Sequence, residues 1–97
     1  MPRRLKHFVS DPSIRFGEAP DGSGTLMELE CNDRPGLLSQ VAAAMVREGA
    51  QVQDARIATF GERVEDTFIV SDRALRPLDA EARESLAAAI REALEKG

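Results

Sequence analysis

Apolar and polar residues alternate in four stretches of the chain and follow a three- and four-residue spacing in two others. Alternation is typical of a strand with one buried face, and the longer spacing is typical of an amphipathic helix. Strands are predicted over residues 13–18, 25–31, 51–60 and 64–71, and helices over residues 35–48 and 79–94. This order favours an α+β domain in which both helices lie on one face of an antiparallel sheet.

The first two predicted strands should form a hairpin. The segment between them, residues 19–24, is dense in turn-forming residues, so the strands are expected to run antiparallel. Ile14 and Phe16 then point into the core, on the same side of the sheet as Met27, Leu29 and Cys31. We interpret Cys31 as a small core residue.

The strand over residues 51–60 contains a slip in its pattern. Val52 shares a face with Ala55, Ile57 and Thr59 only if one extra residue bulges near Gln53-Asp54, and such bulges often lie beside binding sites.

In the next strand Asp66 has the parity of the apolar Val64 and Phe68. We interpret it as lying at the exposed end of the strand, or as a structural ion pair with Arg56 or Arg63 rather than a catalytic group.

The two helices each carry an apolar stripe. The first stripe is expected to bury Leu37, Leu38, Val41, Ala42, Met45 and Val46, with Gly49 ending the helix and Ala43 and Ala44 forming a flank that a partner helix could approach. Asp79 should cap the final helix. Its buried stripe comprises Ala82, Leu86, Ala89, Ile90, Ala93 and Leu94.

The turn at residues 31–38 is the strongest candidate for a binding site. Pro35 is predicted at the first helical position, with Asn32 and Asp33 as caps. Gly36 lacks a Cβ and so lets another group approach the first-turn amides, where the helix dipole favours a carboxylate. Asp33 can pair with an ammonium, so one loop could hold both ends of a free amino acid. Helix capping alone would also account for these residues.

Composition narrows the possible functions. The 97 residues suffice for one domain, and aromatic residues at 4% leave the core to aliphatic packing. A net charge of −4 argues against a nucleic-acid partner. One cysteine, one histidine and no long apolar run exclude an internal disulfide, a His-rich metal site and a membrane span, so a cytoplasmic location is expected. We expect residues 1–12 to be a tether and residues 13–97 a folded domain, and the whole to be a piece of a longer protein.

Two motifs resemble a known family. The run Asp-Arg-Pro-Gly-Leu-Leu at 33–38 and the segment from Ala55 to Val70, with Gly-Glu-Arg-Val-Glu-Asp at 61–66, are similar to ACT domains. The second motif most resembles the C-terminal ACT domain of bifunctional PII uridylyltransferase/uridylyl-removing enzymes, and Arg4 to Phe8 resembles the segment leading into it. The similarity runs from about Arg3 to about Leu94.

This resemblance implies a ferredoxin-like ACT sandwich, a four-stranded antiparallel sheet with two helices on one face. ACT domains ordinarily run βαββαβ, and this chain lacks the last strand. The strand over residues 13–18, hairpinned onto the next, would occupy the same edge in the same direction. We therefore expect the N-terminal strand to take the place of the missing C-terminal edge strand.

The resemblance also implies a regulatory, glutamine-sensing domain that controls uridylylation and deuridylylation of the PII nitrogen signal protein. The chain itself would hold no catalytic residue and no cofactor, and the parent enzyme would depend on Mg²⁺. A second ACT domain, in a homodimer or in tandem, is the expected partner. The expected ligand site comprises Asn32, Asp33, Gly36, Leu37 and Leu38, with Gln53 and Asp54 of the paired domain near the ligand's side-chain amide.

Three alternative functions compete with this one. An ACT interaction module that binds no ligand fits the sequence nearly as well. A small acylphosphatase-like enzyme is disfavoured because Pro35 and the neighbouring Asp33 make a poor phosphate loop. An RNA-binding sheet is disfavoured because the strand over residues 64–71 has one aromatic residue, Phe68, whose parity puts it in the core.

Overall fold

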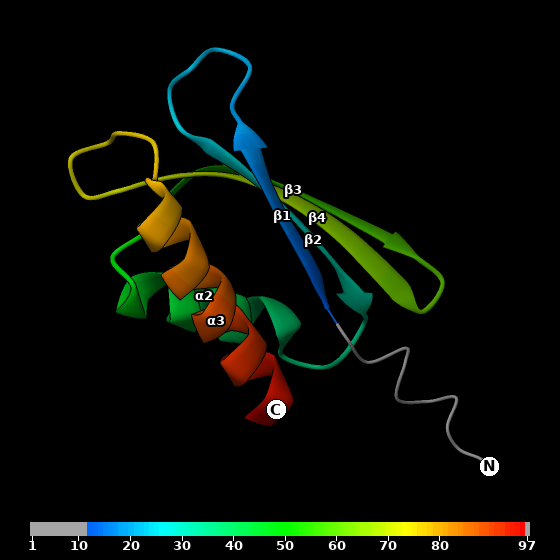
Figure 1. Cartoon of the computed structure of the whole chain (residues 1–97). Helices are drawn as coiled ribbons and strands as arrows, with labels where there is room; N and C mark the ends of the chain where they lie inside the picture. The colour runs from blue at the N-terminus through cyan, green and yellow to red at the C-terminus, as the bar shows by residue number, and fades with distance from the viewer. Residues whose placement is uncertain (1–11, 97) are drawn as a thin grey trace.

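A computed structural model describes residues 12–96 and shows a four-stranded sheet with two helices (Figure 1). The elements are β1 (Ser13–Glu18), β2 (Thr25–Asn32), α2 (Leu37–Arg47), β3 (Gln51–Phe60), β4 (Arg63–Ser71) and α3 (Ala80–Lys96). The strand order is β1-β2-β4-β3, and every neighbouring pair is antiparallel. The predicted α+β class is confirmed. The expected tether, apart from Pro12, lies outside the described residues.

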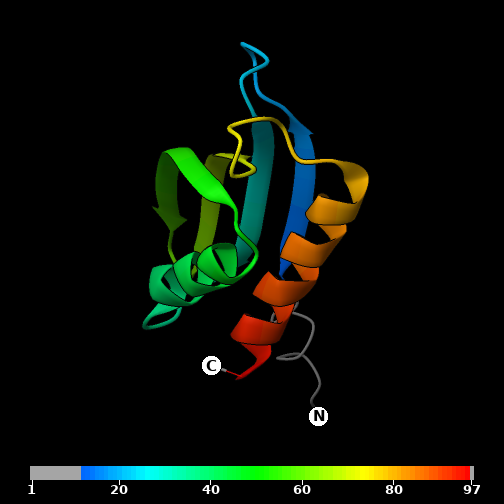
Figure 2. The ribbon, with the colours of Figure 1, turned by 90° about the vertical axis from the view of Figure 1, so that its left-hand side faces the viewer.

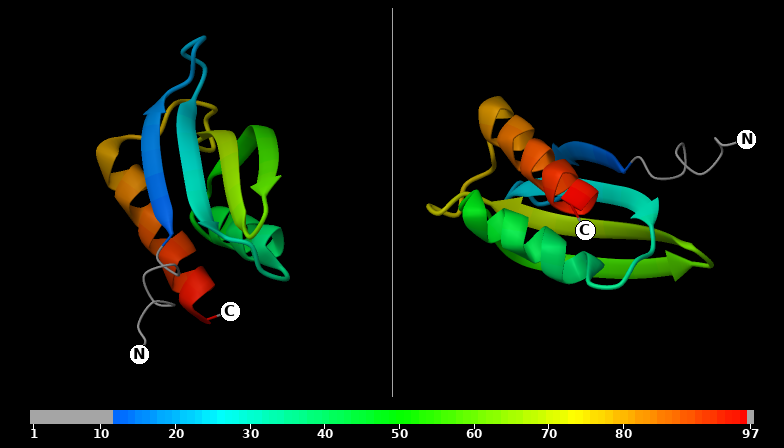
Figure 3. Two further views of the ribbon diagram at one scale, coloured as in Figure 1. Left: turned by 90° about the vertical axis from the view of Figure 1, so that its right-hand side faces the viewer. Right: turned by 90° about the horizontal axis from the view of Figure 1, so that it is seen from below.

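Both helices lie on one face of the sheet, α2 on the side of β3 and β4 and α3 on the side of β1 (Figure 2). The left view of Figure 3 looks onto the opposite face, which neither helix covers. The core between the sheet and the helices consists mainly of aliphatic and sulfur-containing side chains, and Phe68 is its buried aromatic residue. Its fully buried side chains include Met27, Leu29, Val41, Val70, Leu86 and Ile90.

β1 forms one edge of the sheet, as predicted. It pairs with β2 along its whole length, from Ser13 opposite Glu30 to Glu18 opposite Thr25. Its inward side chains, Ile14 and Phe16, pack against the core because they share the helix-covered face. The N-terminal strand therefore occupies the edge that the last strand of a ferredoxin-like sheet would fill.

β3 forms the opposite edge and contains the predicted bulge. Its pairing with β4 shifts register between Val52 and Asp54, so Gln53 is the extra residue. No strand of the described chain pairs with its outer side. Three apolar side chains along it are about half exposed or more: Val52 at 48%, Ile57 at 48% and Phe60 at 60%.

The stripe predicted for α2 is partly wrong. Leu37, Val41, Ala44 and Met45 are buried, but Leu38 is 46% exposed and Val46 is 74% exposed. Ala42, which was predicted to be buried, is exposed. Of the two residues of the predicted flank, Ala43 is exposed but Ala44 belongs to the core. The buried face of α2 is therefore turned away from the predicted stripe, because the helix packs against α3 as well as the sheet. Its remaining apolar residues are therefore left uncovered.

The prediction for α3 is confirmed. Asp79 caps the helix, with its carboxylate accepting a hydrogen bond from the Ala82 amide at 2.8 Å. Leu86, Ala89, Ile90 and Leu94 are buried, and Ala82 and Ala93 pack against them. The segment before the helix is fixed by the Leu78 amide, which donates to the Thr25 hydroxyl at 2.8 Å.

The first helix begins later than predicted. α2 starts at Leu37, not at Pro35, and its N-cap is Gly36 with a φ of 76°. No side-chain oxygen caps it, so the predicted capping by Asn32 and Asp33 is wrong. The left-handed backbone at Gly36 turns the chain sharply, which leaves Pro35 in the turn before the helix.

The predicted exposed or ion-paired state of Asp66 is also wrong. Asp66 is 1% exposed, and neither carboxylate oxygen has a hydrogen-bond partner among the described residues. Asp66 faces the helices, whereas Arg56 and Arg63 pair with positions of opposite parity and face the uncovered side. The two arginines instead contact acidic residues on that side, Asp54 at 3.9 Å and Glu30 at 3.8 Å.

Candidate functional site

The turn between β2 and α2 is tied to two other parts of the molecule. The Asp33 amide donates to the carbonyl of Glu62, in the β3–β4 hairpin, at 2.7 Å. The Arg34 side chain donates from Nη1 to the carbonyl of Leu94, near the end of α3, at 2.5 Å. The turn is therefore held between the hairpin and the last turn of the final helix.

A cavity of about 410 Å³ lies against this turn. Its volume is within the range common for small-molecule sites. It reaches from the turn to the start of β1 and the end of α3, and its lining residues are Pro12, Cys31, Asn32, Asp33, Arg34, Pro35 and Leu94. Two of the predicted site residues, Asn32 and Asp33, therefore line this cavity.

The charges at the cavity come from adjacent residues of opposite sign. The Asp33 carboxylate is on an exposed residue, and the Arg34 guanidinium is on a half-buried one. Burial, reinforced by the nearby Asp66 carboxyl, raises the pKa of the Cys31 thiol. The thiol is therefore protonated at neutral pH, which makes Cys31 a poor nucleophile.

The three amides predicted to hold a carboxylate lie at the start of α2 rather than in the cavity lining. The Leu37 amide already donates to the Arg34 carbonyl at 3.3 Å. The Leu38 amide is in the first helical turn, so it has no intrahelical partner. Space beside Gly36 is open, since an added Cβ would meet no atom within 4 Å.

The other two predicted site residues lie at the far end of the sheet. Phe60 lies near the turn, because it pairs with Arg63, which pairs in turn with Asn32. Asp54 is six residues before Phe60, which is about 20 Å along a strand. The Gln53 amide group instead contacts the β1–β2 loop, where it accepts a hydrogen bond from the Ser23 hydroxyl at 3.4 Å and donates to the Ser23 carbonyl at 3.5 Å. Within one chain, the turn and the bulge are separate.

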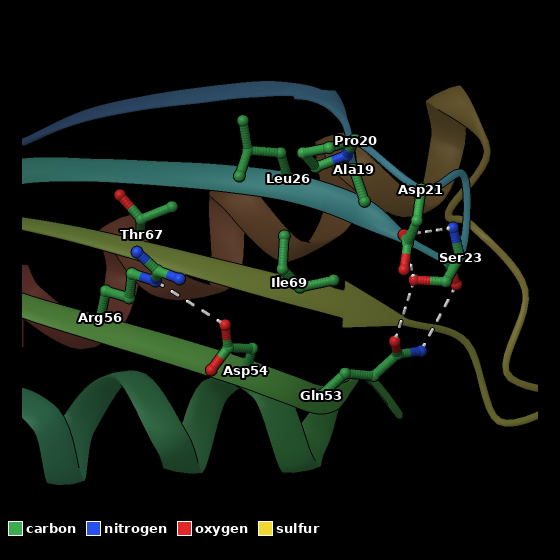
Figure 4. Close-up of a pocket in the computed structure, with 10 residues that line it drawn as sticks. All are labelled: Ala19, Pro20, Asp21, Ser23, Leu26, Gln53, Asp54, Arg56, Thr67 and Ile69. Carbon is green, nitrogen blue, oxygen red and sulfur yellow. Dashed lines mark hydrogen bonds and ion pairs between the residues drawn. The ribbon is translucent and has the colours of Figure 1, made fainter.

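The bulge borders a hollow of about 720 Å³ on the uncovered face of the sheet (Figure 4). Leu26 and Ile69 lie along its middle, with Arg56 and Asp54 on one side and Asp21 and Ser23 at one end. This hollow is larger than the cavity at the turn, and it holds none of the residues of the turn.

Sequence reasoning missed the contribution of α3 to the cavity. Leu94 lies sixty residues from Arg34 in the chain, and the apolar stripe of α3 indicates burial but gives no sign of which loop its end meets. Pro12 is predicted to belong to a tether, yet it lines the cavity. Arg34 belongs to the recognised motif, but its bond to the helix end has no signal in the sequence.

The cavity has the polar groups needed for a small zwitterion but not those of a metal centre. Asp33 and Arg34 line it, and their carboxylate and guanidinium complement an ammonium and a carboxylate respectively. In the described part of the chain, no group of three His, Cys, Asp or Glu side chains could hold a metal ion. None of the described helices is both long and apolar enough to cross a membrane.

Comparison with known proteins gives consistent matches. The family model described as "ACT domain" matches residues 25–94. The chain is 46% identical over 86 residues to the bifunctional uridylyltransferase/uridylyl-removing enzyme of Xanthomonas euvesicatoria, which covers 89% of this chain and 10% of that enzyme. It is 42% identical over 80 residues to the enzyme of the same name from Methylococcus capsulatus, covering 82% of this chain and 9% of that enzyme. The chain thus spans about a tenth of the length of these relatives.

Proposed function

This chain belongs to the ACT-domain family, and from that premise we propose that it is the glutamine-sensing regulatory domain of a uridylyltransferase/uridylyl-removing enzyme. In this role it would control the attachment of uridylyl groups to the PII signal protein, and their removal, by Mg²⁺-dependent catalytic domains outside this chain. The similarity to the regulatory region of such enzymes supports the proposal.

The cavity beside the turn is the observation that carries the ligand-binding part of the proposal. It brings Asn32 and Asp33 to the wall of a 410 Å³ space. The Asp33 carboxylate, with the Asn32 side-chain oxygen, is suited to the ammonium of a free amino acid. The amides of Gly36 and Leu38 are suited to one oxygen of its carboxylate, because they follow Pro35 of the cavity wall and lie at the positive end of the α2 dipole.

Glutamine also needs partners for its side-chain amide, because a buried unpaired polar group costs on the order of 1–3 kcal/mol. The proposed partners are Gln53 and Asp54 of a second ACT domain. The exposed outer side of β3 supports this arrangement, since two such edges can pair side by side and bring the bulge of one domain toward the turn of the other.

An interaction module without a ligand is the second candidate function. Leu38 and Val46 of α2 and Ile57 of β3 are exposed apolar residues, and α2 lies on the side of β3 and β4 (Figure 2). Exposed apolar surface next to unpaired strand groups favours pairing with another domain whether or not a ligand binds. The two candidates differ in one measurement, the binding of a free amino acid.

Calorimetric titration of the chain with each of the twenty amino acids tests the proposal. We expect L-glutamine to bind, and Asp33→Ala to weaken binding by about tenfold or more, the typical effect of losing a hydrogen bond to a charged group. Glu62→Gln is the matched control, because it removes a neighbouring charge while keeping the backbone carbonyl that holds the Asp33 amide.

Two results would contradict the site. Binding of glutamine by Asp33→Ala with unchanged affinity would place the ligand elsewhere, and failure of every amino acid to bind would favour the interaction module. Gly36→Val is a less useful test than its position suggests. A φ of 76° strains any side chain at that residue, so lost binding would not separate a filled site from a distorted turn.

A further inference from the structure

The end of α3 is held by side chains from the turn and α2. An α-helix leaves its last four carbonyls without intrahelical partners. Two of these in α3 accept side-chain hydrogen bonds, the Leu94 carbonyl from Arg34 at 2.5 Å and the Ala93 carbonyl from Gln40 at 3.4 Å. A third contact joins Arg47 to the Glu92 carboxylate at 3.1 Å.

The Arg34 contact is the strongest of these caps. Its distance is short and its donor is charged, and a cation is favoured at the negative end of a helix dipole. The Gln40 bond is long, and the Oε1 atom of Gln40 is buried without a partner among the described residues. The capping of this helix end therefore depends mainly on the guanidinium.

Arg34 also lines the cavity next to Asp33, so one side chain borders both the ligand space and the helix end. A ligand carboxylate in the cavity would be a better acceptor for the guanidinium than a neutral carbonyl, because a pair of opposite charges forms the stronger hydrogen bond. The same carboxylate would add negative charge beside the negative end of α3, which is unfavourable. Both effects favour loosening of the last turn of α3.

We propose that Arg34 is a ligand-contacting residue that gives up the Leu94 carbonyl when an amino-acid carboxylate enters the cavity, so that binding loosens the last turn of α3. This inference rests on the proposed function. It also predicts that Arg34→Ala weakens the affinity for glutamine less than Asp33→Ala does. The bond from Arg34 to the ligand carboxylate replaces its bond to the Leu94 carbonyl, whereas the contact of Asp33 with the ammonium replaces no existing bond.

Hydrogen exchange of the last-turn amides of α3, measured with and without saturating L-glutamine, tests the coupling. In the unaltered chain we expect exchange to become about tenfold faster with glutamine, the factor typical of a lost hydrogen bond to a charged group. In Arg34→Ala, exchange should be fast without ligand and should not change on its addition.

Two further variants make the test specific. Arg34→Gln keeps a hydrogen-bond donor without the charge, so the helix end should stay partly protected and lose its response to glutamine. Arg47→Ala removes an arginine contact to α3 that lies outside the cavity, and its response should remain.

The outcomes separate the inference from the proposed function. If glutamine binds the unaltered chain and exchange at the end of α3 is unchanged or slower, the inference is overturned and the sensing function stands. An Arg34→Gln chain that still responds fully would also overturn it. If calorimetry finds no amino acid that binds, the sensing function fails and the coupling fails with it.

Discussion

Asp66 lies in a core that otherwise contains mainly apolar side chains. It is opposite Leu29 on one neighbouring strand and Ile57 on the other, and it is 1% exposed. Burial raises the pKa of its carboxyl, and the nearby Asp33 charge raises the pKa further, while the Ala58 backbone amide opposes the rise. A charged carboxylate is therefore unfavourable at this position.

The sign of the pH dependence follows from that shift. The protonated form is favoured in the folded chain, so the contribution of Asp66 to stability is fully present below 3.8, the ordinary pKa of an aspartate, and is lost as the pH rises through the raised pKa. At neutral pH the ionised group opposes folding.

Asp66→Asn should therefore stabilise the chain at pH 7, because the amide has a similar shape and no charge. We expect a gain of about 1 kcal/mol in the free energy of unfolding, or about 4–8 °C in Tm, for a domain of this size. Urea denaturation at pH 7 and below pH 4 measures it, and the gain should shrink at the lower pH. Glu65→Gln, at an exposed neighbouring position, should change little. A loss of stability at pH 7 in Asp66→Asn would mean that the charged form has a partner.

The β1–β2 hairpin is the element that completes the sheet. A separate two-stranded hairpin is weak, but here β2 also pairs with β4, so β1 adds to a preformed neighbour. Gly24 allows the hairpin to pass close to β4, since a Cβ there would lie 2.8 Å from the Val70 carbonyl oxygen. β1 covers the edge of β2 that would otherwise be unpaired.

Deletion of residues 1–18 should expose the edge of β2 and promote aggregation. The core would also lose the packing of Ile14 and Phe16. Light scattering during refolding at increasing protein concentration measures the effect. Deletion of residues 1–11, which keeps β1, is the control and should remain in solution. A truncated chain from residue 19 that stays monomeric would show that β1 is dispensable for the sheet.

At the scale of the whole molecule, an unpaired strand edge and exposed apolar side chains occur together on β3 and α2. β3 has free backbone groups along its outer side, and every residue of the strand except Ala58 is exposed. Leu38 and Val46 add apolar surface from the helix. This combination favours a two-fold pairing in which the β3 edges of two domains join into one continuous sheet.

Sedimentation should therefore show a dimer at high protein concentration. Ile57→Lys should shift it to monomer, because a charge on a strand edge opposes pairing of two edges. Arg15→Ala, on the opposite edge of the sheet, should leave the dimer intact. A strict monomer in the unaltered chain would favour pairing with a different ACT domain in a longer protein.

Patterns over a few residues determined most of the fold. The alternation in β1 and β2 and the turn between them predicted the antiparallel hairpin and the inward faces of its strands, because strand faces and hairpin direction depend on neighbouring residues. The slip in the apolar pattern near Gln53 predicted the bulge for the same reason. Asp79, as a capping residue, predicted the start of α3 to within one residue. Asn32 and Asp33 were placed at the candidate cavity by their motif, although their predicted capping role was wrong.

Tertiary packing decided what such patterns do not contain. The rotation of α2, which buries Ala44 and exposes Val46, is set by contact with α3 as well as the sheet. The unpaired state of Asp66 depends on which face its arginine neighbours take, and the bond from Arg34 to Leu94 joins residues sixty positions apart. Sequence periodicity reports the face of each element relative to its own axis. Only the packed structure fixes how the elements are turned toward one another, and therefore which residues form the cavity.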